Sequence, residues 1–233
     1  METVLFYLLH LSLLIVLSLL MFLISMANKK QLHYTFIYLV ISLLIWNIGY
    51  LLEAYARMHY GYTVMLFVYI WYLGLCFTPV FLLLTSIVFE KTKINYKRYL
   101  FLFIPPIVSF IMMITNDRHH LFFKSFSVYN TEAVIGIYFI VHTVFLYGYM
   151  VVSLFNFLYS SIKNSGFFSK QSLYTAIGSL IPLVTNVLVT TKIISVPVYT
   201  TAISFSAAVL FIAVAVFRYH FLSISPIALR TIV

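Results

Sequence analysis

The chain has 233 residues, of which 64% are hydrophobic and only 8% are charged. Soluble domains carry about 25% charged residues, so this composition excludes an ordinary soluble domain and indicates a chain solvated by lipid. The formal net charge of +9 does not indicate a nucleic-acid partner, because the basic residues occupy short gaps between apolar stretches. We therefore predict an all-α, polytopic membrane bundle.

A membrane-spanning helix needs about 20 mostly apolar residues. Seven stretches meet this requirement, in chain order at 3–26, 33–55, 62–88, 99–115, 134–159, 172–191 and 199–217. The gap at 116–133 is the longest, and we expect it to carry structure of its own. The chain is therefore predicted to cross the membrane seven times.

The basic residues predict the orientation of the bundle. Ten lie after the first, third, fifth and seventh stretches: Lys29, Lys30, Lys91, Lys93, Lys97, Arg98, Lys163, Lys170, Arg218 and Arg230. Four lie in the other gaps: Arg57, Arg118, Lys124 and Lys192. Because short cytoplasmic loops carry the excess of Lys and Arg, the N-terminus is predicted outside and the C-terminus inside. Multi-pass insertion in the plasma membrane follows.

Several polar and aromatic residues lie on one face of the second stretch. Trp46, Tyr50, Glu53 and Arg57 follow one another at four- and three-residue spacing. Glu53 and Arg57 could form an interfacial ion pair, or Glu53 could contact a ligand, because ionisable residues inside a membrane are often functional. The sequence leaves both readings open.

Other polar residues lie deeper in the apolar stretches. Asn47 and Asn186 are expected to form hydrogen bonds between helices, and Asn186 could also contact a ligand. His142, in the outer part of the fifth stretch, could pack among apolar side chains or contact a ligand. Cys76 is the one cysteine of the chain, so no intrachain disulfide is possible. The prolines Pro79 and Pro182 could kink their helices or act as hinges.

The sequence contains no motif of a catalytic centre, a phosphate loop or a cofactor site, so we predict neither catalysis nor a cofactor. Two other classes of membrane protein fit the sequence less well than a receptor. A small transporter would need a polar path to both faces, whereas the ionisable groups here gather towards the outside. A metal-dependent membrane hydrolase could draw on Asp117, His119, His120 and His142, but their spacing is poor for zinc, and no metal is predicted.

Five segments resemble the seven-helix N-terminal sensor region of bacterial sensor histidine kinases, which is also found on some diguanylate cyclases. They are residues 45–53, 72–80, 115–123, 179–186 and 217–228. The most specific is Thr-Asn-Asp-Arg-His-His-Leu-Phe-Phe at 115–123, which is similar to a family pattern with Thr-Asn and His-His-Leu-Phe. The chain departs from the family pattern at Asp117 and Arg118, often Pro-Leu, and at Ser223, often Asp.

The resemblance implies a sensory input domain at 1–217, followed at 218–233 by the start of a cytoplasmic signalling helix. It implies a kinase or cyclase module as partner and a homodimer. We expect a small molecule, peptide or lipid to bind between the second, third, fifth and sixth helices. The predicted ligand contacts are Trp46, Asn47, Tyr50, Glu53, Cys76, His119, His120, His142 and Asn186. The predicted relay residues are Pro79, Pro182, Arg218 and Pro226.

Overall fold

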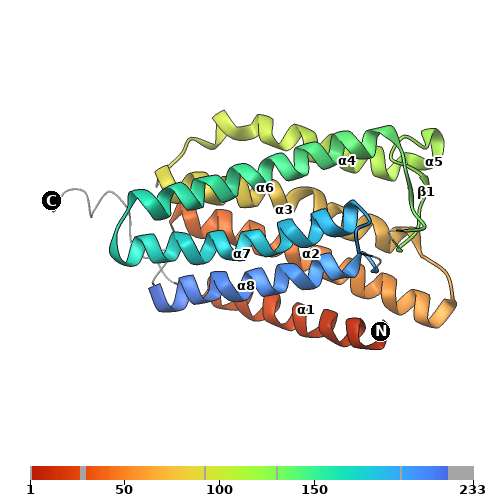
Figure 1. The fold of residues 1–233 in the computed structure, drawn as a ribbon, viewed down its shortest axis with the longest axis horizontal. Coiled ribbons are helices and arrows are strands. Elements are labelled where there is room, and N and C mark those ends of the chain that lie inside the picture. The colour runs from red at the N-terminus through yellow and green to blue at the C-terminus, as the bar shows by residue number, and fades with distance from the viewer. Residues whose placement is uncertain (1, 27–29, 92, 130, 195, 220–233) are drawn as a thin grey trace.

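The computed structural model describes residues 2–26, 30–91, 93–129, 131–194 and 196–219. Its long helices run side by side between two ends of one bundle (Figure 1). The elements are α1 (Glu2–Ser25), α2 (Gln31–Tyr60), α3 (Met65–Lys91), the 3₁₀ helix η1 (Tyr96–Phe103), α4 (Ile104–Ile114), α5 (Asn116–His119), β1 (Phe123–Ser125), β2 (Val134–Ile135), α6 (Ile137–Lys163), α7 (Gly166–Thr190) and α8 (Tyr199–Tyr219). Among the described residues the two strands form one short hairpin, in which β1 lies within the longest predicted gap and β2 directly follows it.

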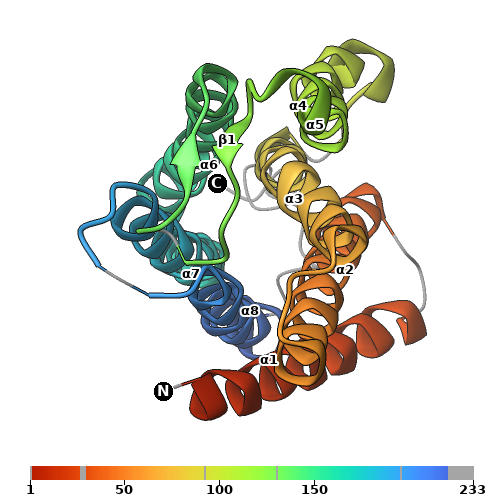
Figure 2. The same ribbon diagram turned by 90° about the vertical axis from the view of Figure 1, so that its right-hand side faces the viewer.

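Six helices form a ring in which each contacts the next. Following the contacts, the order is α1, α2, α3, α6, α7 and α8, and α8 closes the ring against α1 (Figure 2). α4 lies outside the ring against α3 and α6. This arrangement brings α8, the last helix, next to both α2 and α7.

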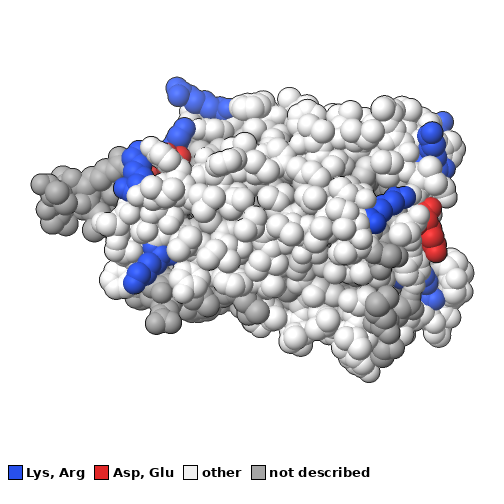
Figure 3. Space-filling model, viewed as in Figure 1, with Lys and Arg blue, Asp and Glu red and all other residues white. Residues whose placement is uncertain are grey.

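Six helical segments of the described chain are long and apolar enough to cross a membrane: α1, α2, α3, the η1–α4 pair, α6 and α7. Apolar side chains such as Leu14, Ile111 and Val144 are exposed on them. On the face drawn in Figure 3, charged residues lie near both ends, and a broad uncharged band separates them. The chain is thus a multi-pass membrane protein. α8 is helical over 21 residues, and its crossing, like the orientation, stays a prediction.

The prolines behave differently at different places. Pro105 and Pro106 lie in the first turn of α4, where a missing N–H is tolerated, and the preceding η1 is a 3₁₀ helix. The fourth stretch is therefore not one regular α-helix, because it changes from a 3₁₀ helix to an α-helix just before these prolines. Pro79 and Pro182 are buried inside α3 and α7, which continue through them. Their role as hinges stays a prediction.

Two glycines let α2 and α3 approach closely. A Cβ at Gly49 would overlap the backbone of Trp71, and one at Gly74 would overlap the backbone of Trp46. Small residues allow such contacts between membrane helices. The aromatic residues close to these glycines, Trp46, Tyr50, Trp71 and Tyr72, are buried.

The two ends of the bundle carry different structures. We call the end with β1, β2 and the first residues of α1, α3, α6 and α8 the hairpin end. The opposite end carries the start of α2 and the turn between α6 and α7, and we call it the basic end. Its described basic residues are Lys30, Lys91, Lys93, Lys97, Arg98, Lys163 and Lys170.

Candidate functional site

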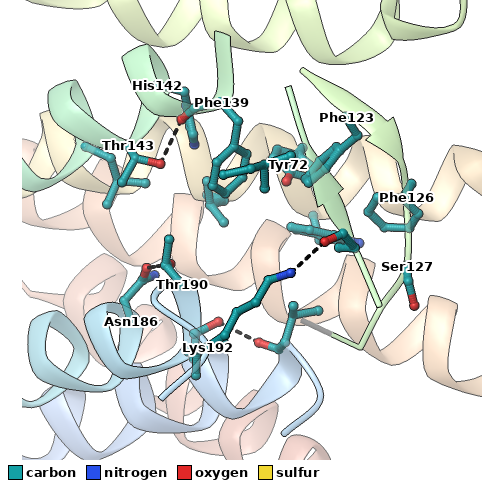
Figure 4. Close-up of a pocket in the computed structure, with 18 of the residues that line it drawn as sticks. Tyr72, Phe123, Phe126, Ser127, Phe139, His142, Thr143, Asn186, Thr190 and Lys192 are labelled. Atoms are coloured by element: carbon teal, nitrogen blue, oxygen red, sulfur yellow. Dashed lines mark hydrogen bonds between the residues drawn. The ribbon is translucent and has the colours of Figure 1, made fainter. Parts of the chain in front are cut away.

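A cavity of about 90 Å³ lies inside the hairpin end of the bundle (Figure 4). Side chains from α2, α3, α6 and α7 line it, which are the four helices expected to form a pocket. Thr201 of α8, Val198 just before it and residues of the β1–β2 segment complete the lining. The cavity therefore touches both the surface loop and α8.

The β1–β2 segment covers the cavity. β1 and β2 pair antiparallel, with Phe123 opposite Ile135, and both of these residues line the cavity together with Phe126. The Nζ of Lys192 donates a hydrogen bond of 2.9 Å to the carbonyl oxygen of Ala133, which ties the segment to the end of α7 (Figure 4). The cover is thus attached to the bundle on the side where α7 leads into α8.

Stacked aromatic rings form one wall. The ring centroids of Trp71 and Tyr72 are 4.1 Å apart, and those of Tyr50 and Trp71 are 4.6 Å apart. Tyr72 also meets Phe123 edge to face, with centroids 6.2 Å apart. Such contacts between aromatic rings are favourable, and they leave an apolar surface that faces the cavity.

Asn186 supplies a fixed amide to the opposite wall. Its Oδ1 accepts hydrogen bonds from the hydroxyls of Tyr147, at 2.9 Å, and Thr190, at 3.1 Å. Within the described residues nothing accepts a hydrogen bond from its Nδ2. Because both partners hold the oxygen, the orientation of the amide is set and two N–H donors remain for another molecule.

Two further polar groups of the cavity have unused hydrogen-bonding capacity. The ring of His142 is buried among Tyr72, Phe122 and Phe139, and it makes no hydrogen bond within the described chain. The indole N–H of Trp71 is buried and also has no partner in the part of the chain that the structure describes. Buried polar groups are rarely left unsatisfied, so the indole N–H calls for a partner from outside the described residues, and the imidazole lines the same cavity.

The formal charge of the lining is positive. Lys192 is its single Lys or Arg, and no Asp or Glu belongs to the lining of described residues. In addition, no three or more His, Cys, Asp and Glu residues cluster as metal ligands within the described ranges. The cavity therefore favours a neutral or anionic molecule over a cationic one.

Three of the predicted ligand contacts line this cavity: Tyr50, His142 and Asn186. Of the others, Asn47 accepts a hydrogen bond from Ser12 of α1 and donates one of 2.9 Å to the carbonyl of Leu43. The expected interhelical hydrogen bond of Asn47 is therefore confirmed. Trp46 packs on Phe205 of α8, with ring centroids 4.8 Å apart.

Glu53 lies beside the cavity and belongs to a buried polar cluster. Its carboxylate accepts hydrogen bonds from the hydroxyls of Tyr199, at 3.1 Å, and Thr63, at 3.3 Å. Arg57 lies 3.9 Å from it, so the ion pair, one of the two possibilities that the sequence left open for Glu53, is present. The guanidinium also lies over the rings of Tyr129 and Tyr199, at 5.2 and 5.3 Å. Glu53 thereby joins α2 to the first residue of α8.

Cys76 is buried and lies away from the main cavity. It borders a separate, much smaller space of about 10 Å³ together with Pro79 and Pro105. His142 borders this space as well. The thiol consequently faces the contact between α3 and α4.

Residues 115–123, which we call the motif turn, are held by their own hydrogen bonds. The Oδ1 of Asn116 accepts the N–H groups of Phe122 and Phe123, both at 3.0 Å, and its Nδ2 donates to the carbonyl of Phe123 at 2.9 Å. The Nδ1 of His119 accepts the N–H of Leu121 at 3.0 Å. His120 is exposed and left-handed, with φ of 54°. Neither histidine lines a cavity that the structure describes; both shape the turn.

The predicted relay residues of the C-terminal segment are only partly described. Arg218 lies in the last turn of α8, and its side chain is outside the described part. Pro226 lies outside the described residues.

Sequence reasoning missed several residues of the cavity. Trp71 was not singled out, Lys192 was counted only as a loop charge, and Thr143 was not considered. Phe123, the last residue of the motif turn, and Phe126 lie in a gap outside the predicted helices, yet these aromatic residues in a loop could have indicated a cover. Depth in the membrane says nothing about loops that fold back.

One comparison with known proteins identifies a relationship. A family model described as the N-terminal 7TM region of histidine kinase matches residues 8–226. Neither the curated proteins nor the solved structures contain a significant match. The matched region covers nearly the whole chain, including the cavity, its cover and α8.

Proposed function

Because the chain belongs to the family of N-terminal 7TM regions of histidine kinases, a membrane-embedded sensor region, we propose that the cavity at its hairpin end is the signal-binding site. A small molecule binds there and changes the position of α8. The full-length protein carries a cytoplasmic kinase module, as the family implies, and α8 leads towards it. The family match gives no support to the transporter or hydrolase alternative.

The observation that carries this proposal is the set of unsatisfied polar groups around the cavity. The Nδ2 of Asn186, the ring of His142 and the indole N–H of Trp71 have no partner among the described residues. The indole N–H is fully buried, and such a group costs about 1–3 kcal/mol when it is unpaired. A ligand that accepts its hydrogen bond recovers this free energy, and the same ligand can bond the amide of Asn186 and the ring of His142.

The lining also indicates the chemistry of the ligand. Ring faces of Tyr50, Trp71 and Tyr72 suit an aromatic or apolar body, and the amide donors of Asn186 suit a carbonyl or carboxylate oxygen. Lys192 at the cover favours an anionic group. We therefore propose a small aromatic or apolar molecule with an oxygen acceptor, neutral or acidic.

The relay runs through the start of α8. The hydroxyls of Tyr50 and Thr201 lie 3.5 Å apart, so a cavity residue of α2 contacts α8 directly. The N–H of Val198 donates to the carbonyl of Val128 at 3.1 Å, which connects the cover to the same place. Together with the Glu53–Tyr199 hydrogen bond, these contacts couple ligand, cover and α8. A ligand with different affinity for two positions of α8 shifts the population between them.

We also propose seven crossings, with the hairpin end outside the cell, the basic end in the cytoplasm and the chain in the plasma membrane as a homodimer. The excess of basic residues after the odd-numbered stretches supports this orientation. A cysteine in place of the exposed Lys124, in a Cys76→Ala background, tests it. A membrane-impermeant maleimide should label intact cells at that position. Labelling only after the cells are opened would show that the hairpin end lies in the cytoplasm and would contradict the proposed orientation.

Native mass spectrometry of the chain purified from its own membranes tests the binding site. We expect one small adduct on the wild type that is lost in His142→Phe and retained in His120→Ala, which changes a histidine outside the cavity. An adduct of the same occupancy on His142→Phe would place the ligand elsewhere.

A further inference from the structure

A second and larger hollow lies at the basic end of the bundle. It measures about 810 Å³ and lies between α2, α3 and η1, far from the cavity under the hairpin. The proposed signal-binding site does not use it, so its composition needs a separate explanation.

A pair of hydrogen bonds builds one side of this groove. The Nε2 of Gln31 donates to the carbonyl of Ile94 at 2.7 Å, and the N–H of Ile94 donates to the Oε1 of Gln31, also at 2.7 Å. The side-chain amide thus pairs with the loop as a strand backbone would. Since Lys30 and Lys93 are the chain neighbours of these two residues, the pair brings two basic residues to one rim of the groove.

The charge of the groove is positive. Lys30 and Lys93 line it, both are exposed, and its lining of described residues contains no Asp or Glu. Four tyrosines, Tyr34, Tyr38, Tyr96 and Tyr99, stand around it. Lysine with tyrosine is the composition that meets phospholipid head groups at the membrane surface.

The remaining surface of the groove is apolar. Phe81 stacks on Tyr38 with ring centroids 5.7 Å apart and meets Phe103 edge to face at 5.6 Å. Leu84 is buried beneath them, and Leu100 stands 61% exposed at the side. A polar, basic rim above an aromatic and aliphatic floor matches a molecule with an anionic head and a hydrocarbon chain.

We propose that this groove binds one anionic phospholipid, with its phosphate between Lys30 and Lys93 and an acyl chain along Phe81, Leu84 and Phe103. The charge complementarity of the rim and the position of the rim where helices α2 and α3 reach the basic end favour this occupant. The inference does not depend on the signal-binding site, because the two hollows share no lining residue.

Lipid retention tests the proposal. The purified chain is exchanged into nanodiscs of phosphatidylglycerol and phosphatidylcholine in equal amounts, released gently, and its bound lipids are counted by native mass spectrometry. The wild type should keep one phosphatidylglycerol in preference to phosphatidylcholine. A Lys30→Gln/Lys93→Gln variant should prefer it about 25-fold less, since each basic residue near the surface contributes a factor of about five.

A matched variant makes the result specific. Lys163→Gln/Lys170→Gln removes two exposed lysines from the same end of the bundle but outside the groove, and it should retain phosphatidylglycerol as the wild type does. Equal loss in both double variants would mean a general attraction to the acidic surface and would overturn the site. Retention by the groove variant would also overturn it. Displacement of the retained lipid by millimolar inorganic phosphate alone would show that the site takes a free anion and not a lipid.

Discussion

The motif turn and the cavity lie at the same end of the bundle, but they use their polar groups in opposite ways. In the motif turn, Asn116 makes three hydrogen bonds to the backbone, and His119 accepts a fourth. In the cavity, Asn186 has only its oxygen engaged, and His142 has no hydrogen bond within the described chain. The two regions thus contain the same residue types, asparagine and histidine, in different states of satisfaction.

This difference separates a folding signal from a binding signal. A conspicuous motif can owe its residues to the shape of a loop, because short polar side chains replace missing backbone hydrogen bonds. A binding site instead contains polar groups that neighbouring residues hold in position and that still have unused hydrogen-bonding capacity. Variants of the motif turn should therefore change the stability, whereas variants of the cavity should change the response to a ligand.

Asn116→Ala should lower the free energy of unfolding by about 3 kcal/mol, because three hydrogen bonds of about 1 kcal/mol each are lost. Denaturation of the purified chain in detergent measures this change. Asn116→Asp keeps an acceptor for Phe122 and Phe123 and should lose only about a third as much. The exposed neighbour Asp117→Ala serves as the control. An unchanged stability of Asn116→Ala would refute a structural role for the motif turn.

Glu53→Ala should cost about 2 kcal/mol, since hydrogen bonds to a charged group contribute about 1.5–3 kcal/mol and Tyr199 and Arg57 lose their buried partner. The same denaturation assay applies. Glu132→Ala removes an exposed carboxylate at the same end and should stay within about 0.5 kcal/mol of the wild type. If both variants behaved alike, Glu53 would not join α2 to α8.

His142→Phe should change the stability by less than about 1 kcal/mol, because the imidazole makes no hydrogen bond within the described residues and another ring of similar shape fills its place. The response of the full-length kinase to its native stimulus should nevertheless be lost. Phosphorylation in membranes, measured beside unfolding, separates the two effects. A variant that is equally stable and fully responsive would remove His142 from the signal-binding site.

His120→Gly should raise the stability slightly, by about 0.5 kcal/mol, because glycine adopts a φ of 54° without a Cβ penalty. Kinase output should not change. Arg118→Gly, in the helical part of the motif turn, should have the opposite sign. Reduced output from a stable His120→Gly protein would show that His120 contacts the ligand after all.

Much of the fold followed from the sequence because a membrane dictates the length of an apolar helix. The predicted ends of the helices were less accurate. α2 continues to Tyr60, five residues beyond the predicted end, and stops where Gly61 becomes left-handed with φ of 78°. α7 begins at Gly166, before the predicted start at residue 172, because polar residues can extend a helix outside the apolar core.

Less of the candidate site followed from the sequence. Spacing on one helix face pointed to Tyr50, and position within the apolar stretches pointed to His142 and Asn186; all three line the cavity. Depth could not show that Trp71 faces inwards, because that depends on the close contact at Gly49. It also could not place Lys192, since a hydrogen bond to Ala133, 59 residues away in the chain, holds it at the cover.

The central claim is that a molecule in the cavity controls output through α8. In a full-length kinase with Cys76→Ala, a cysteine is placed at Thr143, which lines the cavity, or at Thr115, which belongs to the motif turn. Both proteins are labelled with benzyl methanethiosulfonate, and autophosphorylation is measured. The account predicts a change of about five-fold or more for Thr143→Cys, the range of ordinary allosteric coupling, and none for Thr115→Cys. Complete labelling of Thr143→Cys with unchanged autophosphorylation would contradict it.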